Sequence, residues 1–228
     1  MANRLIALQV ETVIVADDHP LFRGALREAV LKACPEATII EAETFAELQE
    51  ATDQHSDADL LLLDLNMPGA TGFSSLIFVR SKHESLPTVV ISALEEPWVI
   101  RRAIAHGAAG FVPKSSPVGV ISEALTAVLE GDCWLPAGME HDDASLEPGE
   151  QAVADRLAQL TPQQFRVFSM LSEGLLNKQI AFELSVSEAT IKAHVTAIMK
   201  KLGVTNRTQA VLEANHLALE RKFPSSVA

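Results

Sequence analysis

Short apolar runs, each followed by polar residues or a turn, mark the first half of the chain. The clearest is DLLLLDLNMPG at residues 59–69, in which four leucines precede the carboxylate of Asp64. A short run that ends at a Pro-Gly turn is typical of a strand buried on both faces of a parallel sheet. Comparable runs predict strands near residues 11–16, 37–41, 59–64, 87–91 and 109–112. We therefore expect an α/β domain with a doubly wound, five-stranded parallel sheet.

Residues 161–204 have a helical periodicity that short breaks interrupt. Thr161 precedes Pro162 at a predicted helix start, and Asn177 is a predicted cap for a short helix over 178–184. Ser187 can cap a longer helix with an apolar stripe at 4-3-4 spacing, formed by Ile191, Val195, Ile198 and Leu202. A helix pair whose second member has a basic outer side can place a recognition helix in DNA. Periodicity alone, however, favours an ordinary helical hairpin with solvated lysines.

Polar side chains follow the ends of several predicted strands. Asp17 and Asp18 follow TVIVA, Asp64 ends the leucine run, Ser92 follows TVVI, and Lys114 follows AGFVP. Open α/β sheets bind ligands outside the carboxyl ends of their strands. The sequence therefore predicts one site that contains two or three carboxylates, a hydroxyl and an ammonium.

Such a site has a definite chemistry. Clustered carboxylates repel one another unless a cation joins them, and oxygen ligands suit Mg²⁺. A carboxylate beside Mg²⁺ can attack phosphorus, while nearby donors neutralise the transferred oxygens. Each residue also has a plainer explanation: Asp18 can cap a helix near Pro20, Asp64 can open the following turn, and Lys114 can simply be solvated. Their coincidence at strand ends, in chain order, favours a shared site.

Residues 11 to about 130 resemble the receiver domain of two-component response regulators, through VADDHPLFR, LLDLNMPGATG, VVISA and GAAGFVPK. The resemblance implies that Asp64 is the phosphoacceptor, that Lys114 assists it, and that Ser92 is the switch hydroxyl. The Mg²⁺ ligands that it implies are Asp17, Asp18, Asp64 and the backbone carbonyl of Asn66. Phe111 stands at the family's aromatic switch position, although it fits a core residue of the last strand equally well.

Residues 160 to about 217 resemble the LuxR-type helix-turn-helix domain of NarL/FixJ-family regulators, through NKQIA, SEATIKAHV and KLGVTNRTQA. The base-facing positions that this implies are Lys192, Ala193 and Thr196. Positions that hold phosphates or frame the helix are Asn177, Lys178, Thr190, His194, Lys200 and Arg207. An apolar stripe on the following helix is a candidate dimer interface that comprises Val211, Ala214 and Leu217. The alternative is that this stripe packs only on its own domain.

The charge distribution agrees with two different domains. The net charge is −12, but residues 1–150 hold 9 basic and 24 acidic side chains, whereas residues 151–228 hold 9 and 6. The second segment, with a net charge of +3, is the one expected to bind DNA, weakly as a monomer. Cys34 and Cys133 have no metal-binding spacing, and no apolar run could span a membrane. No signal peptide is expected at the N-terminus, so the sequence favours a cytoplasmic protein.

We expect three segments: a receiver at 9–131, a linker at 132–156 and a smaller all-α helix-turn-helix domain at 157–221. The expected function is transcription regulation controlled by phosphorylation from a sensor histidine kinase, without enzymatic turnover. The active form should be a homodimer on promoter DNA. One rival class, an aspartyl-phosphate phosphatase, would need an acid/base at position 66, where Asn66 cannot transfer a proton. A second is a DNA-binding regulator that acts independently of phosphorylation.

Overall fold

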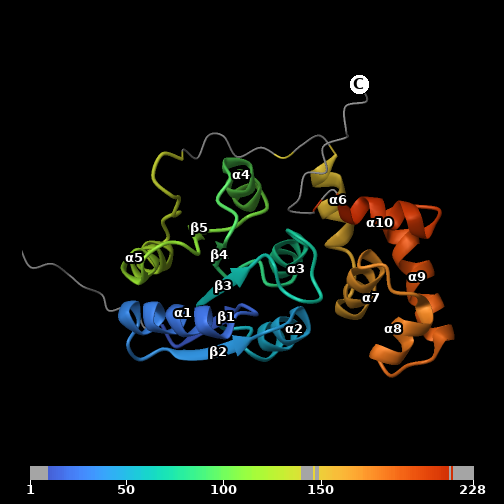
Figure 1. The fold of residues 1–228 in the computed structure, drawn as a ribbon, viewed down its shortest axis with the longest axis horizontal. Coiled ribbons are helices and arrows are strands. Elements are labelled where there is room, and N and C mark those ends of the chain that lie inside the picture. The colour runs from blue at the N-terminus through green and yellow to red at the C-terminus, as the bar shows by residue number, and fades with distance from the viewer. Residues whose placement is uncertain (1–9, 140–145, 147–148, 216, 218–228) are drawn as a thin grey trace, which may run out of the picture.

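The structure is a computed structural model that describes residues 10–139, 146, 149–215 and 217. In this part of the chain, five parallel strands form one sheet in the order β2-β1-β3-β4-β5 (Figure 1). The strands are β1 (Thr12–Ala16), β2 (Thr38–Ala42), β3 (Leu60–Asp64), β4 (Thr88–Ser92) and β5 (Gly110–Pro113). All five expected strands are confirmed to within one residue or so, because each apolar run ends where its buried segment ends.

Alternate residues of the central strands enter two separate cores. Leu60 and Leu62 of β3 pack on one side, whereas Leu61 and Leu63 pack on the other. Five helices supply the opposing surfaces: α1 (Pro20–Ala33), α2 (Phe45–Gln54), α3 (Ser74–Lys82), α4 (Pro97–Ala105) and α5 (Val118–Leu129). The first and last cover one face, and α2, α3 and α4 lie on the other (Figure 1). This burial of both faces explains why β3 has no polar residue before Asp64.

The remaining described helices form a separate, all-α unit. They are α6 (Glu150–Leu157), α7 (Pro162–Ser172), α8 (Asn177–Glu183), α9 (Glu188–Leu202) and α10 (Arg207–Asn215). Thr161 and Gln164 form a reciprocal capping box at the start of α7, and the Ser187 hydroxyl accepts a hydrogen bond from the Thr190 N–H at the start of α9. Gly203 ends α9 with a left-handed backbone at φ 69°. The two-helix geometry expected for DNA recognition is therefore present.

The expected cap of the short helix was wrong by one residue. Leu176, not Asn177, occupies the N-cap position of α8, in an extended backbone conformation. Its own N–H donates to Gln179 Oε1 at 2.7 Å, so the side chain of the third helical residue satisfies the end of the helix. Asn177 is thereby free to serve as the first residue of α8 and to contact Arg207.

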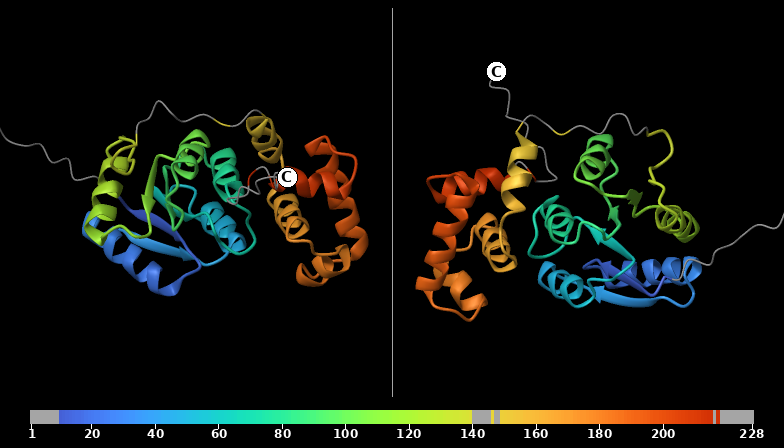
Figure 2. Two further views of the ribbon diagram at one scale, coloured as in Figure 1. Left: turned by 45° about the horizontal axis from the view of Figure 1, so that its top comes forward. Right: turned by 180° about the vertical axis from the view of Figure 1, so that it is seen from behind.

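The two units share a continuous apolar core. Phe165 of α7 packs against Phe45 of α2 and Phe78 of α3, with ring centroids 4.9 and 5.3 Å apart. All three rings are at most 1% exposed, and Gln49 Nε2 donates to the Pro162 carbonyl at 3.3 Å beside them. Both views of Figure 2 place α6 and α7 alongside the α2–α3 side of the sheet. Burial of three aromatic rings means that this contact is substantially hydrophobic. Among the described helices, none is long and apolar enough to cross a membrane.

Candidate functional site

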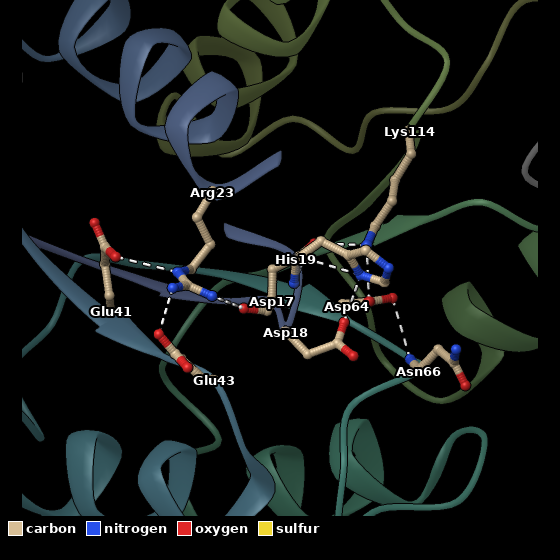
Figure 3. A network of polar contacts seen from close by, with 9 residues as sticks. All are labelled: Asp17, Asp18, His19, Arg23, Glu41, Glu43, Asp64, Asn66 and Lys114. Carbon is tan, nitrogen blue, oxygen red and sulfur yellow. Dashed lines mark hydrogen bonds and ion pairs between the residues drawn. The ribbon is translucent and has the colours of Figure 1, made fainter. Parts of the chain in front are cut away.

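Three of the expected site residues meet directly at the carboxyl edge of the sheet (Figure 3). Lys114, just after β5, places its Nζ atom 2.8 Å from Asp64 Oδ2 and 2.6 Å from Asp17 Oδ2. Asp17 follows β1 and is fully buried, and Asp64 ends β3 at 2% exposure. Because the strands are parallel, their carboxyl ends share one edge of the sheet, and Lys114 reaches from the end of β5 past β4 to Asp64 and Asp17.

Backbone donors fix the orientation of both buried carboxylates. The Asn66 N–H donates to Asp64 Oδ1 at 3.1 Å, and the His19 N–H donates to Asp17 Oδ1 at 2.8 Å. Each carboxylate therefore directs its other oxygen, Oδ2, towards Lys114. Asp18 is more exposed, and its Oδ1 lies 2.6 Å from His19 Nδ1.

The electrostatic balance of this cluster favours an added cation. Burial raises the pKa of Asp64, and the hydrogen bond and charge of Lys114 offset that effect only in part. Burial lowers the pKa of Lys114, but its close contacts with the Asp17 and Asp64 carboxylates outweigh that effect and hold the pKa above its usual value. One buried ammonium thus serves two buried carboxylates, which leaves one negative charge in excess.

The residues fit a hard divalent cation. Ligand atoms of Asp17, Asp18, His19 and Asp64 all lie within 4.8 Å of one another. Asp17 Oδ2 and Asp18 Oδ1 are buried atoms that receive no hydrogen bond of acceptable geometry, although Lys114 and His19 lie within ion-pair distance. Carboxylate oxygens in this number suit Mg²⁺, which also retains several waters.

The cluster opens into a cavity of about 620 Å³. Its lining includes Leu21, Phe22, Asp64, Ser92, Leu94 and Lys114. Ser92 is 2% exposed and its Oγ accepts a hydrogen bond from the Leu94 N–H at 3.1 Å, so the hydroxyl orders the loop that leads to α4. Phe111 is fully buried in the core that contains α2, α3 and α4. This inward position means that any switching role of Phe111 would need a change of rotamer within the core.

The expected DNA-reading residues lie on one exposed side of α9. Lys192, Ala193, Thr196 and Lys200 are exposed, whereas the apolar stripe on the opposite side of the helix is buried. Lys192 Nζ lies 3.1 Å from Glu188 Oε1, one turn earlier, and both side chains are about half exposed. The receiver therefore leaves this side of the helix accessible.

The residues expected to frame the recognition helix divide into two groups. Lys178 and Thr190 are exposed, and His194 is half-buried. Arg207 at the start of α10 instead binds its own domain, through the Leu175 carbonyl and through Asn177 Oδ1 at 3.5 Å. The guanidinium thus connects the start of α8 to the start of α10.

The candidate dimer stripe on α10 is largely covered within the chain. Ala214 and Leu217 are buried, and Val211 is half-buried. The helix packs on α7 and α9, and the Phe73 N–H of the receiver donates to the Leu217 carbonyl at 3.1 Å. The stripe therefore packs on its own domain and, at Leu217, on the receiver.

Two buried charge clusters were not identified from the sequence. Arg23 of α1 binds the Asp17 carbonyl and two glutamates (Figure 3). Glu150 at the start of α6 binds Arg102 and His106 of the α4 region. Burial raises the pKa of Glu150, but hydrogen bonds from His106 and Arg102 outweigh it and hold the pKa below its usual value. VADDHPLFR contains Arg23, but only the fold shows what it contacts.

Known families and proteins match both units of the chain. Residues 13–126 match the response regulator receiver domain, and residues 158–214 match the bacterial regulatory proteins of the luxR family. The glycerol metabolism activator of Pseudomonas putida is 38% identical over 90% of this chain and 95% of its own length. The nitrate/nitrite response regulator NarL of Escherichia coli K12 is 30% identical over 88% of this chain and 93% of its own length.

Solved structures resemble both the whole chain and one of its parts. RcsB of Salmonella enterica serovar Typhimurium, bound to the promoter P1flhDC with the phosphomimetic BeF3⁻, is 25% identical. The structural match covers 92% of this chain and all of the RcsB chain, with a TM-score of 0.53. A LuxR-family response regulator from Silicibacter pomeroyi is 29% identical, with a TM-score of 0.50, over 57% of this chain and 99% of that one. Together with the geometry of the acidic cluster and of α8–α9, these matches show that the chain belongs to the NarL/FixJ family of DNA-binding two-component response regulators.

Proposed function

We propose that Asp64 is the nucleophile that accepts the phosphoryl group. One carboxylate oxygen attacks phosphorus of a phosphohistidine on a sensor kinase, the P–N bond breaks, and the electron pair returns to the imidazole. The geometry that supports this is the contact between Lys114 Nζ and Asp64 Oδ2 at 2.8 Å, at the edge of the cavity. Lys114 can then follow the charge onto a phosphoryl oxygen, while Ser92 lies in the same cavity as a further donor.

The acidic cluster is proposed to hold Mg²⁺ through Asp17, Asp18, Asp64 and the Asn66 carbonyl. The bound ion would supply positive charge that neutralises the incoming phosphate. Lys114 alone cannot do this, because it already serves two buried carboxylates. The same excess of negative charge would repel a phosphodonor if no cation were bound.

The DNA-binding unit is proposed to act as a homodimer on paired half-sites. Lys192, Ala193 and Thr196 would face the bases, and Asn177, Lys178, Thr190, His194, Lys200 and Arg207 would hold phosphates or frame the helix. The RcsB structure, which holds promoter DNA, supports this use of the fold. The contact between two copies would involve Val211, Ala214 and Leu217, which requires the α10 stripe to leave the receiver.

We further propose the domain division 9–131, 132–156 and 157–221. Residues 9, 140–145, 147, 148, 216 and 218–221 lie outside the described residues. The helix α6 belongs to the linker on this division, and it packs on both α3 and α9. The chain is expected to act in the cytoplasm, and to be phosphorylated stoichiometrically rather than to turn over a substrate.

Coupling between the two units is proposed to run through the β3–α3 loop and α4. Phe73 lies in the loop that follows Asp64, and its N–H binds Leu217. The Arg102 guanidinium lies 4.6 Å from the Phe73 ring centroid and also binds Glu150. A shift of this loop on phosphorylation would thus act on α10 and α6 together. It would change the balance between docked and separated arrangements.

The observation that carries the proposal is the buried Asp17–Lys114–Asp64 cluster, and phosphorus labelling tests it. Purified chain with a small phosphodonor and Mg²⁺ should incorporate about one phosphoryl group per chain, and Asp64→Asn should incorporate none. Asp57→Asn is a matched control that removes an exposed carboxylate outside the cluster. Stoichiometric labelling of Asp64→Asn, or labelling that survives metal chelation, would contradict the assignment.

A second candidate function has its own support. The base-facing side of α9 is already exposed while the two units are docked. Such a chain could bind DNA without phosphorylation. Footprints of the wild-type chain and of Asp64→Asn, both treated with a small phosphodonor and Mg²⁺, would separate the two functions. Equal occupancy of the DNA at all protein concentrations would favour phosphorylation-independent binding.

A further inference from the structure

A buried arginine lies behind the acidic pair without belonging to it. Arg23 of α1 is 7% exposed, and its guanidinium makes three hydrogen bonds. Nη1 donates to the Asp17 carbonyl at 2.9 Å, Nε donates to Glu41 Oε2 at 3.1 Å, and Nη2 donates to Glu43 Oε1. One side chain thus joins the end of β1 to the end of β2 (Figure 3).

This arrangement fixes the backbone of Asp17 on both sides of its Cα atom. Its N–H donates to the Ala42 carbonyl at 3.0 Å, and its carbonyl accepts from Arg23. The two glutamates that bind Arg23 flank Ala42 at positions 41 and 43, so all three anchors come from the end of β2. The backbone N–H and carbonyl of Asp17 are both hydrogen-bonded, and its Oδ1 accepts from the His19 N–H. Asp17 can therefore direct only Oδ2 into the acidic cluster.

The positive charge of Arg23 lies close to the proposed cation site. A positive charge close to a cation site opposes cation binding, and a buried guanidinium costs free energy unless its donors are paired. Glu41 and Glu43 pair it and cancel its field, so Arg23 can hold the Asp17 carbonyl without a net positive charge. The planar guanidinium fork holds these three donors on separate nitrogens in a fixed geometry, whereas a lysine ammonium has its three donors on one rotatable atom.

We propose that Arg23 is a positioning residue that sets the affinity of the acidic pair for divalent cations. It acts on the cation through the Asp17 peptide and does not touch the ion itself. The inference rests on the proposed Mg²⁺ site, and it adds a residue outside the ligand set. Groups that orient metal ligands typically change metal affinity by roughly 10-fold to 100-fold when they are removed.

Charge and positioning predict opposite results for the same substitution. Arg23→Met removes a positive charge, so a purely electrostatic role predicts tighter cation binding. A positioning role predicts weaker binding, because the Asp17 carbonyl loses its donor. Arg27 is the matched control: it lies one turn along α1, its Nη1 atom is 3.7 Å from Glu41 Oε1, and its side chain is 54% exposed. Arg27→Met removes the same charge and leaves the Asp17 peptide untouched.

The experiment measures Mn²⁺ binding to the full chain by electron paramagnetic resonance, and Mg²⁺ binding by displacement of Mn²⁺. We expect Arg23→Met to weaken both by about 10-fold or more. Arg27→Met should change them by about twofold or less, as for an exposed charge. Arg23→Lys keeps the charge but loses the fork, so it too should bind more weakly than the wild type. This second variant carries the test if Arg23→Met does not fold.

The outcomes separate this proposal from the proposed function. If wild-type chain and Asp17→Asn bind Mn²⁺ equally, the metal site itself is wrong. If the wild type binds and Asp17→Asn does not, but Arg23→Lys and Arg23→Met bind at least as tightly as the wild type, Arg23 has no positioning role. A fall in melting temperature with unchanged cation affinity would likewise overturn the proposal and leave Arg23 as a link between α1 and β2.

Discussion

Glu150 of α6 and Arg102 of α4 form a buried ion pair, with Arg102 Nε and Nη2 each 2.7 Å from Glu150 Oε1. His106 Nε2 lies 2.7 Å from the same oxygen, and all three side chains are less than 9% exposed. Since an ionised carboxylate can only accept hydrogen bonds, His106 donates here through Nε2. This contact fixes the start of α6 to the helix that follows the Ser92 loop.

Glu150→Gln should loosen the contact between the two units. The amide keeps the shape but removes the negative charge that binds Arg102, which costs about 2 kcal/mol for a hydrogen bond between charged groups. We expect small-angle scattering to show a larger radius of gyration without phosphorylation. Asp155→Asn removes the same charge from an exposed position on α6 and should leave the scattering curve unchanged. Identical curves for Glu150→Gln and the wild type would show that this ion pair does not hold the units together.

The contribution of Glu150 should also have a defined pH dependence. Its pKa is lowered in the folded chain, so its stabilisation is present above the ordinary pKa of a glutamate and is lost as the pH falls through the lowered value. The stability difference between the wild type and Glu150→Gln, followed by chemical denaturation, should therefore be flat near neutrality and shrink only in acid. A difference that changed between pH 6 and 8 would contradict this assignment.

Asp64→Asn should stabilise the folded chain while it abolishes phosphorylation. Because burial raises the pKa of Asp64, its ionised form is disfavoured in the folded state at neutral pH. Without added cations we expect a melting temperature roughly 2–4 °C higher, the effect of about 1 kcal/mol in a chain of this size. The gain should shrink as the pH falls through the raised pKa, because the wild-type carboxyl is then neutral like the amide.

The control for this prediction is Asp57→Asn, which removes an exposed carboxylate just before β3. Its melting temperature should follow that of the wild type at every pH. Added Mg²⁺ should raise the melting temperature of the wild type and of this control, but have less effect on Asp64→Asn. A lower melting temperature for Asp64→Asn at neutral pH would show that the cluster stabilises the fold.

Ser92→Ala should accept phosphate but respond weakly to it. The Ser92 hydroxyl binds the Leu94 N–H and lines the cavity of Asp64, so it can exchange one contact for the other. Without it, the loop before α4 has no direct connection to the phosphoryl group. We expect normal labelling and at least a severalfold smaller gain in DNA affinity, with Ser81→Ala on α3 as the control. A full gain in Ser92→Ala would exclude this route.

The sequence was sufficient to predict local structure and residues at strand ends, but not contacts between distant segments. The run LLLLD reports burial on both sides directly, so β3 and the position of Asp64 follow from it. Phe165 gives no such signal, because a ring that packs on its own domain and one that packs on Phe45 look alike in the sequence. Arg23 and Glu150 were missed for a related reason: their oppositely charged partners lie 18 to 48 residues away and become neighbours only in the fold.

Cap positions show a subtler limit of sequence reasoning. Asn is a favoured N-cap residue and Leu is not, so the sequence pointed to Asn177 as the cap of α8. The actual cap, Leu176, relies on Gln179 to satisfy its N–H. Local preference was overridden here by a side chain three residues further along.

The two lysines on the outer side of α9 should contribute differently to DNA binding. Lys192 and Lys200 are both exposed, but Lys192 lies in the first half of the helix, the part that enters the major groove in this motif. Lys192→Ala should lose about 1–3 kcal/mol on the specific site and discriminate less between bases. Lys200→Ala should weaken specific and unrelated DNA alike and reduce the slope of log affinity against log salt by about one. Lys32→Ala, on α1 of the receiver, is the control, because its side chain is exposed and α1 covers the face of the sheet away from the DNA-binding unit (Figure 1). Binding isotherms on both DNAs at several salt concentrations measure these effects. Equal losses of discrimination from both α9 variants would mean that the helix enters the groove further along its length than the family geometry implies.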